Sequence, residues 1–194
     1  MIRASELSKR FGDKRVLDGL DFKVERGGFL LVTGPNGSGK STLLRLCAGL
    51  AAPTAGRLDI AVDRAEIGFL AHEPLVYREL TALENLDLYG RLYRIPERRE
   101  RIGMLLERFG LWQGRNERAG AFSRGMLQRL ALCRTLLHEP ELVLLDEPFS
   151  GLDKAGSAVL DSELGELRAN RTLLVASHTP DRIAGLATDR LALA

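Results

Sequence analysis

The sequence has few cysteines and almost no net charge, and both scarcities exclude classes of protein. Its 194 residues include only 2 Cys, and 28 basic residues nearly balance 26 acidic ones, which leaves a net charge of +2. Cys47 and Cys133 lie far apart and form no Cys-x-x-Cys pair, so we expect buried reduced thiols rather than a zinc site or a disulfide framework. The balanced charge gives no sign of a nucleic-acid partner.

The sequence also lacks a long apolar run. No segment approaches the roughly 18 apolar residues that a membrane-spanning helix needs, and residues 1–6 lack the apolar core of a signal peptide. We therefore expect a cytoplasmic chain that reaches a membrane only through a partner. The hydrophobic fraction of 45% is sufficient for a packed core, and the length fits one sizeable domain.

Short apolar segments bounded by turn residues predict the strands. The N-terminal part is typical of a β-meander, with a turn at Gly12-Asp13 and a second turn signal at Arg26-Gly27-Gly28. Continuous apolar runs further along are typical of buried strands. The predicted strands cover residues 2–7, 16–24, 29–33, 142–145 and 172–176.

Helical periodicity fills most of the sequence between the third and fourth predicted strands. We expect helices at 43–50, where Gly49 and Pro53 end the pattern, and at 125–137. Residues 73–117 show a mostly helical spacing of apolar side chains. Apolar strands separated by helices predict an α/β fold with a mainly parallel sheet.

Residues 34–41 match the phosphate-binding pattern Gly-x-x-x-x-Gly-Lys-[Ser/Thr], between an apolar strand and a helix. Glycines let the backbone N–H groups of such a loop turn toward phosphate oxygens, and the following helix adds its positive N-terminus. We expect Lys40 to reach the β- and γ-phosphates of ATP and the Ser41 hydroxyl to bind Mg²⁺. The residues expected to bind the nucleotide here are Gly34, Pro35, Asn36, Gly37, Ser38, Gly39, Lys40, Ser41 and Thr42.

An acidic pair follows the apolar strand at 142–145. Asp146 is expected to hold Mg²⁺, and Glu147 is expected to polarise the attacking water as a general base. A Ser-His pair, Ser177-His178, follows the next strand. A nucleotide hydrolase needs an acidic pair at the end of a strand that neighbours its phosphate loop, so Asp146 and Glu147 predict a nucleotide hydrolase.

Further motifs appear in a fixed order around the acidic pair. Residues 122–129 read Phe-Ser-Arg-Gly-Met-Leu-Gln-Arg, and residues 148–153 read Pro-Phe-Ser-Gly-Leu-Asp. Together with the phosphate loop and His178, they resemble the ATP-binding subunits of ABC transporters over essentially the whole chain. The resemblance implies a P-loop NTPase of ABC type, with a mainly parallel sheet core, an N-terminal antiparallel β region and a helical subdomain.

The resemblance also implies one domain over residues 1–194. Residues 1–72 and 138–194 would form its core, and about 73–137 its helical subdomain. Such subunits hydrolyse ATP with Mg²⁺ and work as homodimers or heterodimers on integral membrane permease subunits. The location implied is peripheral, on the inner face of the cell membrane.

Individual roles follow from matching positions. By resemblance, Phe11 stacks on adenine, and His178 contacts the γ-phosphate. Ser123 and Gly125 belong to the signature motif that meets ATP held by the opposite subunit, and Asp153 belongs to the loop that crosses the dimer interface. A serine hydroxyl, a glycine N–H and a helix N-terminus are suited to an anion.

The sequence departs from the family pattern in two places, the signature motif and the position of a usual Gln. Arg124 and Met126 replace the commoner signature residues Gly and Gln, and His72 stands where a Gln usually contributes to the Mg²⁺ and water site. A neutral imidazole can ligate a metal or make one hydrogen bond, so His72 is counted with Ser41 and Asp146 as a metal-site candidate. His72 and the segment 79–86 resemble the ATP-binding subunit of the cytochrome c maturation haem exporter.

Two rival functions and one rival explanation for a surface remain open. A soluble ABC-type ATPase acting as an assembly or regulatory factor would carry the same motifs, whereas a module that only binds nucleotide would not need Glu147 and His178. Within the helical region, Glu84, Leu86 and Tyr89 are candidates for a surface that docks on a membrane partner, and ordinary helix packing is the competing explanation.

Overall fold

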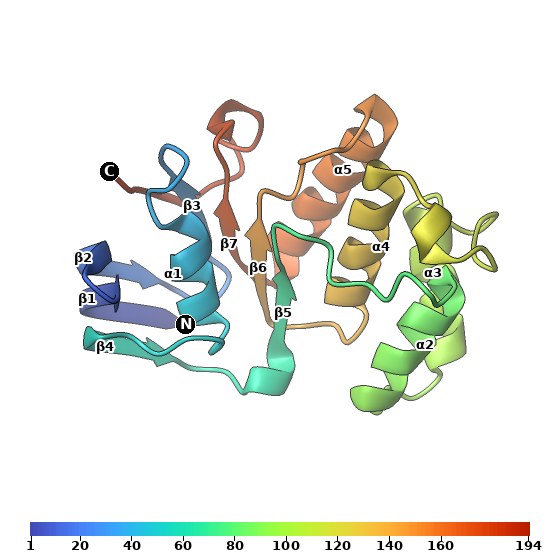
Figure 1. Ribbon diagram of the computed structural model, residues 1–194, viewed down its shortest axis with the longest axis horizontal. Coiled ribbons are helices and arrows are strands. Elements are labelled where there is room, and N and C mark those ends of the chain that lie inside the picture. The colour runs from blue at the N-terminus through green and yellow to red at the C-terminus, as the bar shows by residue number, and fades with distance from the viewer.

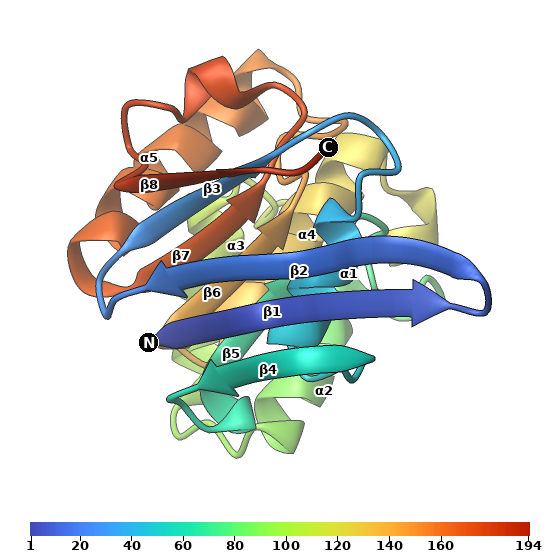
Figure 2. The ribbon, with the colours of Figure 1, turned by 90° about the vertical axis from the view of Figure 1, so that its left-hand side faces the viewer.

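The computed structural model describes residues 1–194 and contains two sheets (Figure 1). The smaller sheet is antiparallel, with strand order β2-β1-β4. Its first two strands are joined by the expected turn at Gly12-Asp13. Figure 2 shows this sheet lying across the strands of the larger one. Its strands are β1 (Ile2–Phe11), β2 (Lys14–Val24) and β4 (Ala55–Ile60).

The larger sheet is entirely parallel, with strand order β5-β6-β7-β3-β8. The three central strands are almost completely buried, which explains why their sequences are continuous apolar runs rather than alternating ones. Parallel pairing places their carboxyl ends at one edge. The strands are β3 (Phe29–Thr33), β5 (Ile67–Leu70), β6 (Leu142–Asp146), β7 (Thr172–Ala176) and β8 (Asp189–Ala192).

Helices cover both faces of the parallel sheet. Helix α1 lies between the two sheets, while α4 and α5 lie on the opposite face and α2 and α3 stand beyond α4 (Figure 1). The helices are α1 (Lys40–Cys47), α2 (Ala82–Leu92), α3 (Arg98–Arg108), α4 (Arg124–Leu136) and α5 (Lys154–Asn170). No helix combines the length and the apolar character that crossing a bilayer requires.

Strand side chains alternate between two hydrophobic cores. In β6, Leu142 and Leu144 face the core around α1, whereas Val143 and Leu145 face the core formed with α2 to α5. This is the period of two that a strand imposes. Each cysteine lies in one of these cores as a free thiol, and burial raises the pKa of Cys47 to about 12. The expectation of buried reduced thiols is confirmed.

The predicted elements are largely present, and the differences have local causes. The 73–117 region contains α2 and α3 but also long irregular segments, including residues 71–81. Pro74 and Pro96 interrupt helical hydrogen bonding there. Helix α5 and strands β4, β5 and β8 were not predicted. Strands β4 and β8 lie at sheet edges with mostly exposed side chains, so their apolar signal is weak.

One docking candidate is wrong. Leu86 is completely buried within the core on the helical side, so its side chain stabilises packing and offers nothing to a partner. Glu84 is exposed and instead completes the capping box of α2, where its carboxylate accepts a hydrogen bond from the N–H of Thr81. Tyr89 is partly buried against the same core and lines a surface pocket with Leu75.

Candidate active site

The phosphate loop connects β3 to α1 and depends on glycine backbone geometry. Gly34, Gly37 and Gly39 have φ values of 148°, 87° and 98°. A Cβ atom on Gly39 would lie 2.9 Å from the carbonyl oxygen of Val16, so only glycine fits. Gly39 also precedes the first turn of α1, which no side chain caps. That helix N-terminus is therefore left to bind an anion.

Lys40 lies back over this loop. Its side chain is buried, and Nζ donates hydrogen bonds to the carbonyl oxygens of Gly34 at 2.7 Å and Pro35 at 3.0 Å. No carboxylate forms an ion pair with it. The ammonium charge therefore remains available to phosphate at the mouth of the loop.

Asp146 ends β6 beside the phosphate loop. Its Oδ1 is buried without a hydrogen-bond partner. Burial raises the pKa of Asp146 above its ordinary value, although the Ser41 hydroxyl and the charge of His72 oppose that rise. A buried carboxylate with one oxygen that lacks a hydrogen-bond partner is suited to a cation, as the metal assignment of Asp146 and Ser41 requires.

Glu147 and His178 meet across the ends of β6 and β7. Nδ1 of His178 lies 2.7 Å from Oε2 of Glu147, within hydrogen-bonding distance. The Glu147 backbone has φ 51°, an unfavourable conformation for a residue other than glycine, and its N–H donates to the carbonyl oxygen of Ala176. The two expected catalytic side chains thus form one pair.

A pocket of about 430 Å³ joins these features. It brings the phosphate loop, the acidic pair and His72 together, and it also contains Lys14 and Val16, which the sequence analysis did not identify. The sequence signal that could have identified Lys14 is its position directly after the turn that follows Phe11. The pocket is lined by Phe11, Lys14, Val16, Asn36, Gly37, Gly39, Lys40, Ser41, Thr42, His72, Asp146 and Glu147.

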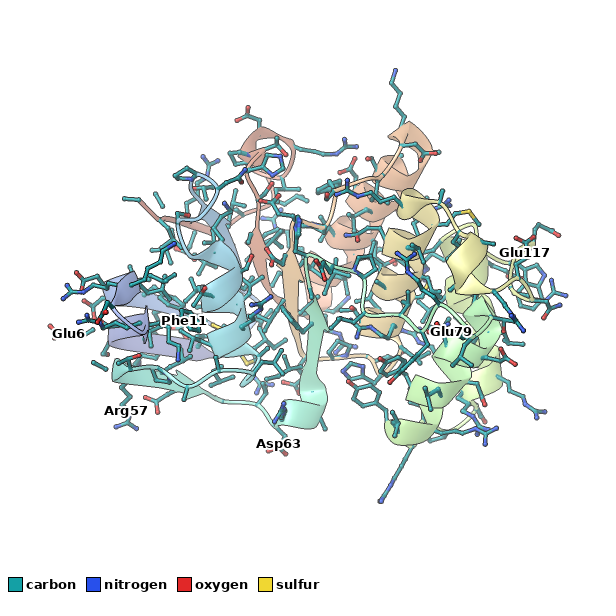
Figure 3. The ribbon with its side chains drawn as sticks, in the orientation of Figure 1. Glu6, Phe11, Arg57, Asp63, Glu79 and Glu117 are labelled. Atoms are coloured by element: carbon teal, nitrogen blue, oxygen red, sulfur yellow. The ribbon has the colours of Figure 1, made fainter.

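Phe11 forms one wall of this pocket at the turn between β1 and β2 (Figure 3). Its side chain is 54% exposed, so it is not a core residue of the meander. The ammonium of Lys9 lies 5.0 Å from the ring centroid and donates to the carbonyl oxygen of Ala52. An exposed aromatic ring held beside a phosphate loop is suited to stacking on a base.

Ser123, Gly125 and Asp153 lie outside the pocket. The Ser123 hydroxyl accepts a hydrogen bond from the N–H of Met126 and caps α4, and Asp153 caps α5 by accepting from the N–H of Gly156. Gly125 packs against the carbonyl oxygen of Gly151. One chain therefore assembles the phosphate-loop half of the expected site, and these three residues are not part of that half.

The metal-site candidates do not form a complete protein cage. No group of three or more His, Cys, Asp and Glu side chains is arranged to hold a metal ion. His72 lines the pocket as an exposed side chain and acts on Asp146 through its charge. A cation here would need further ligands from hydroxyls, phosphates or water, which is the coordination that Mg²⁺ favours.

The fold and this pocket define a P-loop ATPase domain of ABC type. The chain belongs to the ABC transporter family, whose model matches residues 17–150. It is 39% identical over 197 residues to the daunorubicin resistance ATP-binding protein DrrA3 of Streptomyces coeruleorubidus, a match that covers 95% of this chain and 62% of DrrA3. It is 35% identical over 203 residues to the ABC transporter ATP-binding protein NatA of Bacillus subtilis, covering 96% of this chain and 82% of NatA.

A solved structure supports the same assignment. A dimeric ATP-binding cassette in a post-hydrolysis state, bound to ADP and Pi, superposes on this chain with a TM-score of 0.89 at 28% identity. The match covers 100% of this chain and 94% of that cassette. The expected fold class is therefore confirmed. The chain spans about three fifths of the length of DrrA3.

Proposed function

We propose that this chain hydrolyses ATP as the nucleotide-binding subunit of an ABC transporter and works as a dimer. The observation that carries the proposal is the 2.7 Å contact between Glu147 and His178 at the edge of the pocket that also holds the phosphate loop. A module that only binds nucleotide has no use for a carboxylate held in this way beside the phosphate site.

The pocket residues have separate tasks in this mechanism. The loop N–H groups and Lys40 bind and orient the β- and γ-phosphates, and Phe11 supports the base. Glu147 accepts the proton of the water that attacks the γ-phosphorus, while His178 keeps the Glu147 carboxylate in place and contacts the γ-phosphate. The bond from the γ-phosphorus to the bridging oxygen breaks, and ADP and phosphate are released.

Ser41 and Asp146 would hold Mg²⁺, because they supply a hydroxyl and an unpartnered buried carboxylate oxygen on the same side of the pocket. When bound, the ion neutralises charge that develops on the β- and γ-phosphates. His72, which lines the same pocket, would hydrogen-bond water near that ion. Its exposed imidazole substitutes there for the amide usual in the family.

The signature residues explain why two chains are needed. Ser123 and Gly125 lie outside their own pocket, at the start of a helix whose N-terminus suits a phosphate. In the proposed dimer they close the partner's ATP site, and Asp153 lies at the interface. ATP would hold the subunits together, and hydrolysis would let them separate and move a membrane partner.

Cargo is determined by that membrane partner, so the chain itself supports only a general assignment. DrrA3, by its name, serves daunorubicin resistance, and we extend this to a proposal of export from the cytoplasmic face of the membrane. Haem export rests on His72 and the segment 79–86 alone and stays a narrower hypothesis. The soluble assembly factor is the rival, and co-purification with a multi-span membrane subunit would exclude it.

The direct test uses Glu147→Gln. We expect ATP turnover to fall by about 10³-fold, because the general base is lost, while ATP binding persists. Light scattering of this variant should show the mass doubling on addition of Mg-ATP. The added substitution Lys40→Ala should abolish that doubling, because it removes the phosphate-binding ammonium.

Glu107→Gln is the matched control, since Glu107 is an exposed helical glutamate without an ion pair. It should behave as wild type. Unchanged turnover in Glu147→Gln would refute the general-base assignment. His72→Gln can then be added to Glu147→Gln. If this double variant binds ATP and still stays monomeric, ATP-driven dimerisation of the isolated chain is refuted.

A further inference from the structure

Arg124 makes a contact that its place in the signature motif does not explain. It is the first residue of α4, directly after Ser123, and its Nη2 donates a 2.8 Å hydrogen bond to Oγ of Ser150. Its aliphatic part covers Gly151: a Cβ atom on Gly151 would lie 2.8 Å from Cγ of Arg124 and 2.9 Å from Cδ. The family's usual glycine at this position could make neither contact.

The start of α4 and residues 148–151 make further contacts. Gln128, one turn further along α4, is buried and donates from Nε2 to the carbonyl oxygen of Pro148 at 3.2 Å. A Cβ atom on Gly125 would lie 2.9 Å from the carbonyl oxygen of Gly151. The first turns of α4 therefore pack directly against the backbone of residues 148–151, with no room for a larger side chain between them.

Residues 147–152 form two overlapping hydrogen-bonded turns. The N–H of Ser150 donates to the carbonyl oxygen of Glu147 at 3.0 Å, and the N–H of Leu152 donates to that of Phe149 at 3.2 Å. Glu147 and Gly151 both have positive φ, of 51° and 78°. The positive φ is strained only at Glu147, since glycine adopts it freely, and such strain is maintained only by the surroundings. Ser150 is therefore connected to Glu147 through a single hydrogen-bonded turn.

We propose that Arg124 is a positioning residue for Glu147. It fixes the Ser150–Gly151 turn to the helix start that carries Ser123, and so sets where the Glu147 carboxylate stands. This inference rests on the proposed ATPase function. In the proposed dimer, Ser123 serves the partner's ATP while Glu147 acts on ATP in its own pocket, so Arg124 makes the occupancy of one site affect catalysis at the other.

The test is a double-mutant cycle on Arg124 and Ser150 in the full chain. Arg124→Ala should lower kcat by about tenfold, because a small displacement of a catalytic group is enough for that loss, and leave the KM for ATP within about twofold. The Hill coefficient for ATP should fall toward one. Ser150→Ala should act in the same direction more weakly, and the double variant should be no worse than Arg124→Ala.

Two further variants separate positioning from general damage. Arg124→Lys keeps a donor and an aliphatic stem, so it should recover part of the lost kcat. Arg168→Ala is the matched control, since Arg168 is an exposed helical arginine on α5 with no hydrogen-bond or ion-pair partner, and it should leave kcat and the Hill coefficient unchanged.

Three results would overturn the proposal. Wild-type kinetics in Arg124→Ala would show that the contact does not matter. A strongly raised KM, or loss of ATP-dependent dimerisation when Arg124→Ala is added to Glu147→Gln, with Ser150→Ala unaffected, would show that Arg124 contacts the partner's phosphates instead. Absence of hydrolysis in both wild type and Arg168→Ala would refute the proposed function itself, and this inference with it.

Discussion

Two helices of this protein begin at residues expected to face phosphate, and they begin differently. Helix α1 follows Gly39, whose φ of 98° excludes a side chain, and no side-chain oxygen caps it. Helix α4 follows Ser123, whose hydroxyl accepts a hydrogen bond from the N–H of Met126. The first helix start lies in the pocket with Asp146 and Glu147, and the second lies outside it.

The comparison shows which half of the site is prepared in a single chain. The N–H groups at the start of α1 have no side-chain partner, so an anion meets a preorganised cradle. At α4 the Ser123 hydroxyl already accepts a hydrogen bond from an N–H of its own helix. The Arg124 side chain lies over the turn at Ser150 and Gly151. In the proposed dimer that half would receive a phosphate from the partner subunit, and in the single chain it is a capped helix start.

The largest effect should come from breaking the α1 cradle with Gly39→Ala. The new Cβ would lie 2.7 Å from Cδ2 of Leu17 and 2.9 Å from the carbonyl oxygen of Val16, at a φ that disfavours alanine. We expect unfolding free energy to fall by about 2–3 kcal/mol and ATP binding to be lost. Chemical denaturation and titration with a fluorescent ATP analogue measure the two effects.

Gly19→Ala serves as its control. Gly19 also has a positive φ, of 58°, but a Cβ atom there would contact nothing within 4 Å. It should lose about 1 kcal/mol from backbone strain and keep normal ATP binding. Equal losses in the two variants would mean that strain alone, rather than the close packing against Val16, explains the requirement for glycine.

A smaller effect should follow from removing the cap of α4. Ser123→Ala should cost about 1 kcal/mol, which corresponds to about 2–4 °C in Tm for a chain of this size, and should prevent ATP-driven dimerisation in the Glu147→Gln background. Ser123→Asp keeps a good helix cap but adds negative charge opposite phosphate. It should keep the Tm and still fail to dimerise, whereas normal dimerisation would contradict the role of Ser123.

The smallest effect should appear at Asp146, as a pH dependence of stability without nucleotide. Because burial raises its pKa, the folded chain binds this proton more tightly than the unfolded chain does. The wild type therefore gains stability as the pH falls through the raised pKa, and Asp146→Asn does not. At pH 7 the Asn variant should have a slightly higher Tm, and the difference should vanish as the pH approaches 3.8, the ordinary value.

Adding Mg-ATP should reverse that order. The wild type should gain more in Tm than Asp146→Asn, since a charged carboxylate would hold the cation more tightly than a neutral amide does. Thermal unfolding followed by circular dichroism across the pH range measures both comparisons. A wild type that stays more stable than the Asn variant at neutral pH without nucleotide would show that the buried carboxylate has a partner after all.

Local motifs made much of the site predictable. The glycines and Lys40 of the phosphate loop form a contiguous pattern whose geometry follows from backbone sterics, and Asp146 and Glu147 directly follow a strand with an unmistakable apolar run. Lys14 escaped prediction because its place in the pocket depends on how β2 lies against α1. Leu86 was misjudged because helical periodicity gives no information about which face a neighbouring helix covers.

Local conformation and the period of a strand are enough to predict the phosphate loop, the carboxylates and the apolar strands that bring them to one sheet edge, so the chemistry of the site follows from the sequence. Three features follow from the tertiary structure alone: His178 lies within hydrogen-bonding distance of Glu147, Oδ1 of Asp146 has no hydrogen-bond partner, and Arg124 donates to Ser150. These contacts join residues 26 or more positions apart or depend on what packs around a carboxylate, and no local pattern encodes them.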